Sequence, residues 1–270
     1  MRILFFGDIV GQYGFDAMSD VLSKLVKALR VDFVIANGEN LSRGKGLVYK
    51  DYQALMDIGV DVVTLGNHYA SKNDILDYIA QVPALIRPAN LKRDFPGSGT
   101  LIFNVNDVEI QVTNMLGQAF IEEESESPID AMMDILEKHH ARVHIVDYHG
   151  ESTSEKQIFA SYFDGQVSAV IGTHTHVQTN DAKILPNGTG FMADAGFSGR
   201  VDSILGWDTD SVIDKIVNGN ERSRFSIPVD GDKEVDCVYL EIDEETGSTV
   251  RIEPIRLING KEVSYGTHNL

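Results

Sequence analysis

Short apolar runs alternate with amphipathic segments through the first third of the chain. The apolar runs are rich in β-branched residues, which is typical of strands buried on both faces, and they occupy residues 2–7, 32–37 and 61–65. After each of these runs comes an amphipathic segment, which predicts helices at residues 15–30, 49–58 and 72–80. The alternation of strand and helix predicts right-handed crossovers and a mostly parallel core.

The rest of the chain adds strands of a different kind. Residues 101–105 and 108–115 predict a hairpin with Asn106-Asp107 as its turn. Ser127-Pro128 is typical of an N-cap and first helical residue, and that helix would end near His140. Another helix is predicted at residues 154–163, and further strands at residues 143–147, 167–171, 182–185, 190–193, 235–242 and 249–258. Together these elements predict an α/β fold of two stacked mixed sheets with helices outside.

Residues 198–232 interrupt this pattern, because they are polar and rich in turn-forming residues. One short helix is predicted there, at residues 210–217. With 270 residues and 43% hydrophobic content the chain can bury a sizeable core, so we expect one domain over residues 1–270. Residues 198–232 would then form a flap or an excursion over the functional site.

Composition and charge exclude several classes of protein. Cys237 is the only cysteine of the sequence, which excludes an intrachain disulfide and a thiolate zinc cluster and favours a cytoplasmic location. The apolar stretch 3–6 is too short for a secretory signal, and no apolar run approaches the ~18 residues that cross a bilayer, so we expect a soluble protein. The net charge of −18 argues against bulk DNA binding, although a site of carboxylates and metal could take a small anionic ligand.

Residues that can bind metal follow the predicted strands. His174 and His176 come after strand 167–171, and in an extended chain both side chains would face one cavity and hold one ion or two adjacent ions. By itself this pair would also suit a polar turn. The other strand-end candidates are Asp8, Glu39, Asn40, Asn67, His68 and His149. Because ligands collect at the carboxyl ends of strands in open α/β sheets, we expect these side chains to converge in one crevice.

Such a mixture of carboxylate, amide and imidazole suits two six-coordinate ions ~3.5 to 4 Å apart that share one carboxylate, for which Glu39 is the natural candidate. The strand-end motifs are Gly7-Asp8, Gly38-Glu39-Asn40, Gly66-Asn67-His68, His149 and Gly172-Thr173-His174-Thr175-His176. They resemble those of the calcineurin-like metallophosphoesterases, and the likeness runs from Arg2 to about Gly199.

Two departures narrow this resemblance. The superfamily usually has Asp-x-His in its first motif and Asp as the bridge, whereas this chain has Asp8-Ile9-Val10 and Glu39. These substitutions are similar to those of the bacterial YmdB-type branch, which is described as di-iron phosphodiesterases acting on 2′,3′-cyclic nucleotides. In that branch the Asn after the Glu, here Asn40, supplies the missing ligand.

The resemblance implies an α-β-β-α sandwich and a division of the ligands between two metal ions. One metal would be held by Asp8, Glu39, Asn40 and His176, and the other by Glu39, Asn67, His149 and His174. His68 would be left free as the proton donor. The bridging water would become hydroxide under two cations and attack phosphorus in line, while the departing ribose oxygen is protonated from the opposite side.

The implied cofactor is a pair of iron ions, although manganese or zinc also accepts these ligands. The implied substrate is a small phosphodiester such as a cyclic nucleotide, and a homo-oligomer is compatible with the sequence. Two alternatives stay open, because fold does not fix substrate. One is a phosphomonoesterase or protein phosphatase on the same scaffold. The other is a non-enzymatic metal-binding regulator, which would have no use for an unligated His68.

Other polar residues are predicted to lie outside the metal site. The histidines expected to be structural are His139 and His140 at a helix end, His144 in a strand and His268 near the terminus. The acidic run at residues 122–126 is expected to be solvated. Arg43 and Lys45, in the loop 42–46, suit either solvent or a phosphate. Asp194 could support the site from behind its ligands.

Overall fold

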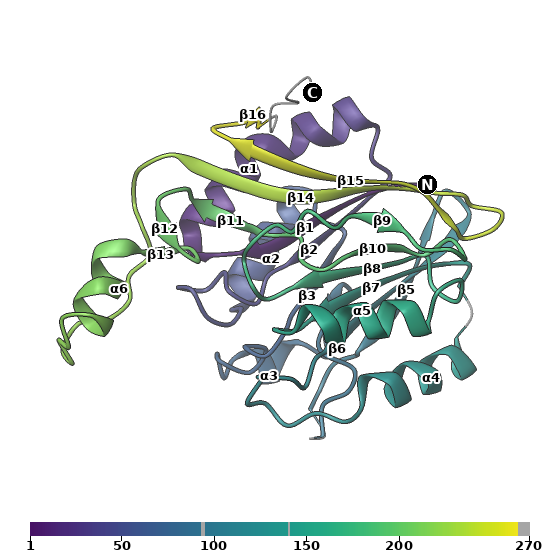
Figure 1. The fold of residues 1–270 in the computed structure, drawn as a ribbon, viewed down its shortest axis with the longest axis horizontal. Coiled ribbons are helices and arrows are strands. Elements are labelled where there is room, and N and C mark those ends of the chain that lie inside the picture. Colours follow the sequence, from purple (N-terminus) through teal and green to yellow (C-terminus); the bar gives the residue numbers. More distant parts are fainter. Residues whose placement is uncertain (93–94, 140, 264–270) are drawn as a thin grey trace.

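The computed structural model describes residues 1–92, 95–139 and 141–263, and its two large β-sheets stack face to face (Figure 1). The first sheet has the spatial order β16 (Lys261–Glu262), β15 (Thr249–Ile258), β14 (Lys233–Ile242), β11 (Phe197–Arg200), β1 (Arg2–Ile9), β2 (Phe33–Asn37), β3 (Val62–Thr64) and β4 (Leu85–Ile86). The second has the order β5 (Thr100–Val105), β6 (Val108–Leu116), β7 (Val143–His149), β8 (Ala169–Thr173), β10 (Gly190–Met192) and β9 (Lys183–Ile184).

Parallel pairing forms the middle of both sheets. The strands β1 to β4 are successive parallel neighbours, and so are β6, β7, β8 and β10. Antiparallel strands extend both sheets, since β14 pairs with β1 and β5 pairs with β6. The predicted hairpin is confirmed, and Asn106 and Asp107 have φ of 51° and 68°, the left-handed conformation that short hairpin turns favour.

Helices cover the outer face of each sheet (Figure 1). They are α1 (Gly11–Leu29), α2 (Tyr49–Asp57), α3 (Ile75–Tyr78), α4 (Pro128–Lys138) and α5 (Thr153–Tyr162). Met18 of α1 belongs to the same apolar core as Leu4 of β1, on the outside of the first sheet. Phe159 of α5 belongs to the core outside the second sheet with Val146 of β7. A third core fills the space between the sheets, so the predicted fold class is confirmed.

Several elements differ from the prediction. The first helix begins at Gly11 rather than at residue 15. Its start was missed because the first turn contains glycines, and glycine is a weak helix former. Gly14 is needed there, since a Cβ at this position would lie 2.2 Å from the backbone oxygen of Ser198. The strand β11 was not predicted at all; it overlaps the start of the polar segment 198–232 and neighbours β1 and β14.

The remainder of that segment leaves the sandwich and carries β12 (Ser203–Ile204), β13 (Trp207–Asp208) and α6 (Thr209–Ile216), which projects from the body of the molecule (Figure 1). Its base touches the strand-end loops. Leu205 offers its carbonyl oxygen to His176 at 2.9 Å, and Trp207 packs on Gly44. The excursion therefore borders the predicted site, while its role as a flap stays a prediction.

Within the described residues, none of the helices combines the length and the apolar character that crossing a bilayer requires.

Candidate metal centre

The predicted ligand residues meet at one edge of the sandwich, where the carboxyl ends of strands from both sheets face each other. The first sheet contributes Asp8, Glu39, Asn40, Asn67 and His68, and the second contributes His149, His174 and His176. The predicted convergence is therefore seen, and both sheets contribute to it. The strand ends still converge, because parallel strands within each sheet end at the same edge.

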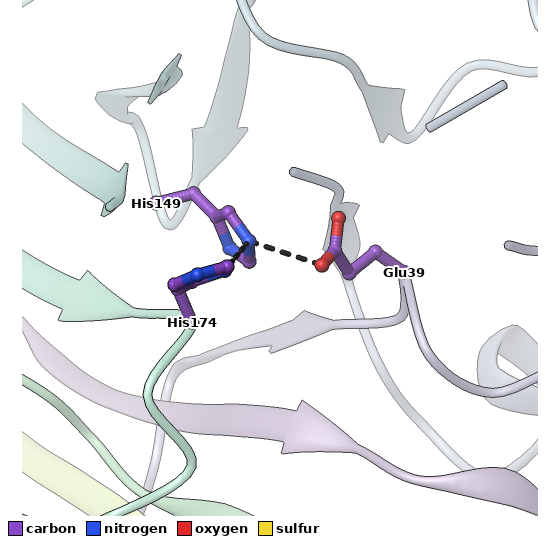
Figure 2. Close-up of side chains that lie close together, drawn as sticks. All are labelled: Glu39, His149 and His174. Atoms are coloured by element: carbon purple, nitrogen blue, oxygen red, sulfur yellow. Dashed lines mark hydrogen bonds and ion pairs between the residues drawn. The ribbon is translucent and has the colours of Figure 1, made fainter. Parts of the chain in front are cut away.

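One group of donor atoms surrounds a ring nitrogen of His149. The oxygen Oε1 of Glu39, Oδ1 of Asn67 and Nδ1 of His174 each lie 3.0 Å from His149 Nε2. Figure 2 shows Glu39, His149 and His174 pointing toward one another, and their ligand atoms all lie within 4.8 Å of one another. These residues are the set that the sequence assigned to one metal.

A second group of donor atoms gathers around Asp8. Its Oδ1 lies 3.0 Å from Asn40 Nδ2 and 3.5 Å from His176 Nε2. Asn40 Nδ2 also lies 3.1 Å from His176 Nε2 and 3.5 Å from Glu39 Oε1, so Glu39 borders both groups. Asn40 turns its amide nitrogen toward these atoms, and a half-turn about its last side-chain bond would present the amide oxygen to a cation instead.

The two histidines after β8 do not lie on an extended chain, so that assumption of the sequence analysis is wrong. His174 and His176 have φ of 101° and 60°, which puts both in the left-handed region. The turn is held by side chains, because Asp8 Oδ2 accepts from the backbone N–H of His174 at 3.0 Å and Asp194 Oδ2 accepts from that of Thr175 at 2.9 Å. As a result each imidazole enters a different donor group.

Charged neighbours outweigh burial in setting the pKa values of Asp8, Glu39 and His149, whereas burial lowers the pKa of His174 to about 4. Burial opposes ionisation of Asp8 and Glu39, but His176 and His149 hold the pKa of these carboxyl groups below its usual range. Burial also opposes protonation of His149, yet Glu39 and Asp8 raise its pKa to about 9. The carboxylates of Asp8 and Glu39 therefore favour a positive charge beside them. Buried oxygen and imidazole donors of this kind fit iron, manganese or zinc.

The ring of His68 lies beside the donor groups. The backbone N–H of His68 donates to Glu39 Oε2 at 2.9 Å, and its ring Nδ1 lies 3.5 Å from Asn67 Nδ2. Burial is the main reason that the pKa of His68 falls below its usual value. The imidazole of His68 thus lies close to the cluster, but it is not one of the groups described above around His149 Nε2 or Asp8 Oδ1. The predicted role as proton donor needs an imidazole in such a place.

The structure adds supporting residues that the sequence analysis did not identify. Glu151 Oε2 lies 3.1 Å from His174 Nε2, and its position two residues after His149 was the one available clue. Lys156 of α5 is fully buried and donates to the Thr173 carbonyl oxygen and to Asp194 Oδ2, at 2.8 and 3.1 Å. Asp194 therefore does support the ligand loop from behind.

The remaining polar candidates lie elsewhere. His144 is buried, and its Nε2 lies 2.8 Å from Thr113 Oγ1, which confirms a structural position. His139 is the C-cap residue of α4, while His140 and His268 lie outside the described residues. Arg43 and Lys45 are exposed, so contact of either with a phosphate stays a prediction.

Val10 occupies the position at which the superfamily usually has a histidine. We expect Val10→His to give no large gain in activity, because Asn40 fills that side of the Asp8 group. The added ring would also collide with Gly206, where even a Cβ would lie 2.5 Å from Val10 Cγ1. Metal content and hydrolysis rate should be compared with those of Val10→Leu, which adds bulk without a ligand atom. A Val10→His protein much more active than both Val10→Leu and the natural chain would contradict the role of Asn40.

Comparison with known proteins points to one family. A model of the YmdB-like proteins matches residues 4–255. The 2′,3′-cyclic-nucleotide 2′-phosphodiesterase of Bacillus subtilis (strain 168) is 41% identical over 266 residues, which cover 98% of this chain and 100% of that protein. A novel phosphatase from Mycoplasma pneumoniae is 32% identical with a TM-score of 0.89, over 96% of this chain and 93% of that one. A hypothetical protein from Thermus thermophilus is 35% identical with a TM-score of 0.88, over 96% of this chain and 99% of that one.

Proposed function

The chain belongs to the family of YmdB-like proteins, and from this premise we propose that it hydrolyses 2′,3′-cyclic nucleotides with two bound metal ions. The resemblance first drawn from the strand-end motifs is confirmed, and the sandwich is the calcineurin-like metallophosphoesterase fold. The observation that carries the proposal is the pair of donor groups that border Glu39, with the His68 ring beside them. The activity named for the B. subtilis protein supports the substrate class.

When bound, the two ions would neutralise charge on the phosphate and make a water molecule acidic enough to attack at neutral pH. The side chains of the protein would bind the two ions and supply the proton for the leaving oxygen. Glu39 is proposed to contact both ions, and the other ligands are Asp8, Asn40 and His176 for one ion and Asn67, His149 and His174 for the other. His68 would hold the proton that passes to the ribose oxygen as its bond to phosphorus breaks. Ring opening then yields a nucleoside monophosphate.

Iron is the proposed resident metal, because the motifs place the chain in a branch described as di-iron, although the same nitrogen and oxygen ligands accept manganese or zinc. The cytoplasm is the proposed location, since the sole cysteine, Cys237, is free and buried.

Protein purified without chelators is expected to contain two metal ions per chain, because the donor atoms form two groups around Glu39. It should hydrolyse 2′,3′-cyclic AMP and an aryl phosphodiester faster than an aryl phosphomonoester. Elemental analysis and the three assays, run on the same preparation, check this. One ion per chain in active protein would overturn the binuclear centre. Preference for the monoester would favour a phosphomonoesterase, and metal without any activity would favour a binding protein.

A further inference from the structure

A line of fully buried polar side chains runs beneath His149, on the side of the ring away from the donor cluster. The Nδ1 atom of His149 lies 3.0 Å from Thr173 Oγ1, and that hydroxyl lies 2.6 Å from Asp147 Oδ1. All three residues are 0% exposed. The other oxygen of Asp147, Oδ2, accepts from the hydroxyl of Thr64 and from the side-chain amide of Asn37.

The directions of these hydrogen bonds follow from counting hydrogens. Asn37 Oδ1 accepts from the backbone N–H of Glu39 at 3.1 Å, which fixes the amide orientation. The two hydrogens on Asn37 Nδ2 are then directed to Asp147 Oδ2 and the Leu65 carbonyl oxygen, at 3.1 and 3.2 Å. Asn37 Nδ2 therefore has no hydrogen to spare for His149 Nδ1, which lies 3.5 Å away.

Thr173 has a single hydroxyl hydrogen for two neighbours. Asp147 Oδ1 accepts from the Thr173 hydroxyl, while Asp147 Oδ2 accepts from Thr64 and Asn37. The single Thr173 hydrogen is therefore used in the 2.6 Å hydrogen bond to Asp147 Oδ1. Thr173 Oγ1 is left to accept from His149, so the His149 proton must lie on Nδ1.

We infer that Asp147 and Thr173 are positioning residues, which fix His149 in the tautomer whose Nε2 lone pair faces the metal centre. The inference rests on the proposed function, because it assigns a metal to His149. It accounts for the side of the ring at which Glu39, Asn67 and His174 converge, since all three contact Nε2. Outer partners of this kind orient metal-binding histidines and raise their basicity.

The chain offers a matched pair of substitutions. Thr173→Val removes the hydroxyl between Asp147 and His149, whereas Thr64→Val removes a hydroxyl that bonds the same carboxylate without touching His149. Both side chains are fully buried at strand ends, and valine keeps their shape. Purified holoenzymes would be dialysed against graded EDTA and the retained metal measured. We expect Thr173→Val to lose metal at about 10- to 100-fold lower chelator strength than Thr64→Val, which should stay near the natural chain.

Equal metal retention in the two variants would overturn the inference, while failure of the natural chain to bind metal would instead overturn the proposed function. The tautomer gives a second test that needs no variant. In zinc-loaded protein labelled with ¹⁵N, the His149 ring should carry its proton on Nδ1, shielded from exchange with water. A proton on Nε2 would refute the inference, and so would an Nδ1 proton that exchanges as fast as that of an exposed histidine.

Discussion

Replacing His68 by alanine is expected to slow hydrolysis of 2′,3′-cyclic AMP by about 10²- to 10⁴-fold, the usual contribution of general acid catalysis, while both metal ions stay bound. The ribose oxygen is a poor leaving group and needs a proton as its bond to phosphorus breaks. His68 donates its backbone N–H to Glu39 Oε2 at 2.9 Å, and alanine keeps that hydrogen bond. Metal content and circular dichroism should therefore match those of the natural chain.

The diagnostic is the choice of substrate. With a bis-nitrophenyl diester the departing oxygen needs little protonation, so the loss in His68→Ala should shrink markedly. An equal loss on both substrates would indicate that His68 positions the phosphate instead. Loss of metal from His68→Ala would make His68 a ligand. Either outcome would remove the proton-donor role from the proposed mechanism.

Replacing Glu39 by glutamine is expected to remove both metal ions and, with them, the activity. Glu39 Oε1 lies 3.0 Å from His149 Nε2 in one donor group and 3.5 Å from Asn40 Nδ2 in the other. Glutamine keeps the volume but loses the charge that two cations would share. Removing only an outer partner of a ligand typically lowers metal affinity by about 10- to 100-fold, and the loss in Glu39→Gln should be larger than that.

Asp8→Asn is the matched control for Glu39→Gln, because its Oδ1 faces His176 and Asn40 but not the atoms around His149. It should weaken one ion only. Elemental analysis of both variants after dialysis would distinguish the two results. If Glu39→Gln retained one ion at full occupancy, Glu39 would not be shared, and the two donor groups would be independent sites.

The sequence predicted where the candidate donor residues gather, because strand ends are local features. A buried apolar run followed by Asp8, or by Asn67 and His68, is visible within a few residues of chain. Parallel strands then end at one edge of a sheet whatever their order, so convergence follows from the alternation of strands and helices. The helix N-cap at Ser127 was predicted from local sequence in the same way, and its side chain accepts from the backbone N–H of Asp130.

The tertiary structure decided how these residues are divided and supported. The order of strands splits the candidate ligands between two sheets, and the left-handed turn at His174 is held by Asp8, which accepts its N–H across a sequence separation of 166 residues.

The partners of Asp147, Thr173 and Lys156 likewise come from other strands and helices. The residues that neighbour a buried polar side chain in the sequence do not indicate which distant group will be its hydrogen-bond partner. What the sequence determined by itself was therefore the set of candidate donor residues and the edge of the fold at which they gather. Their geometry, tautomers and supporting hydrogen bonds depended on contacts between segments far apart in the chain, which only the packed sheets bring together.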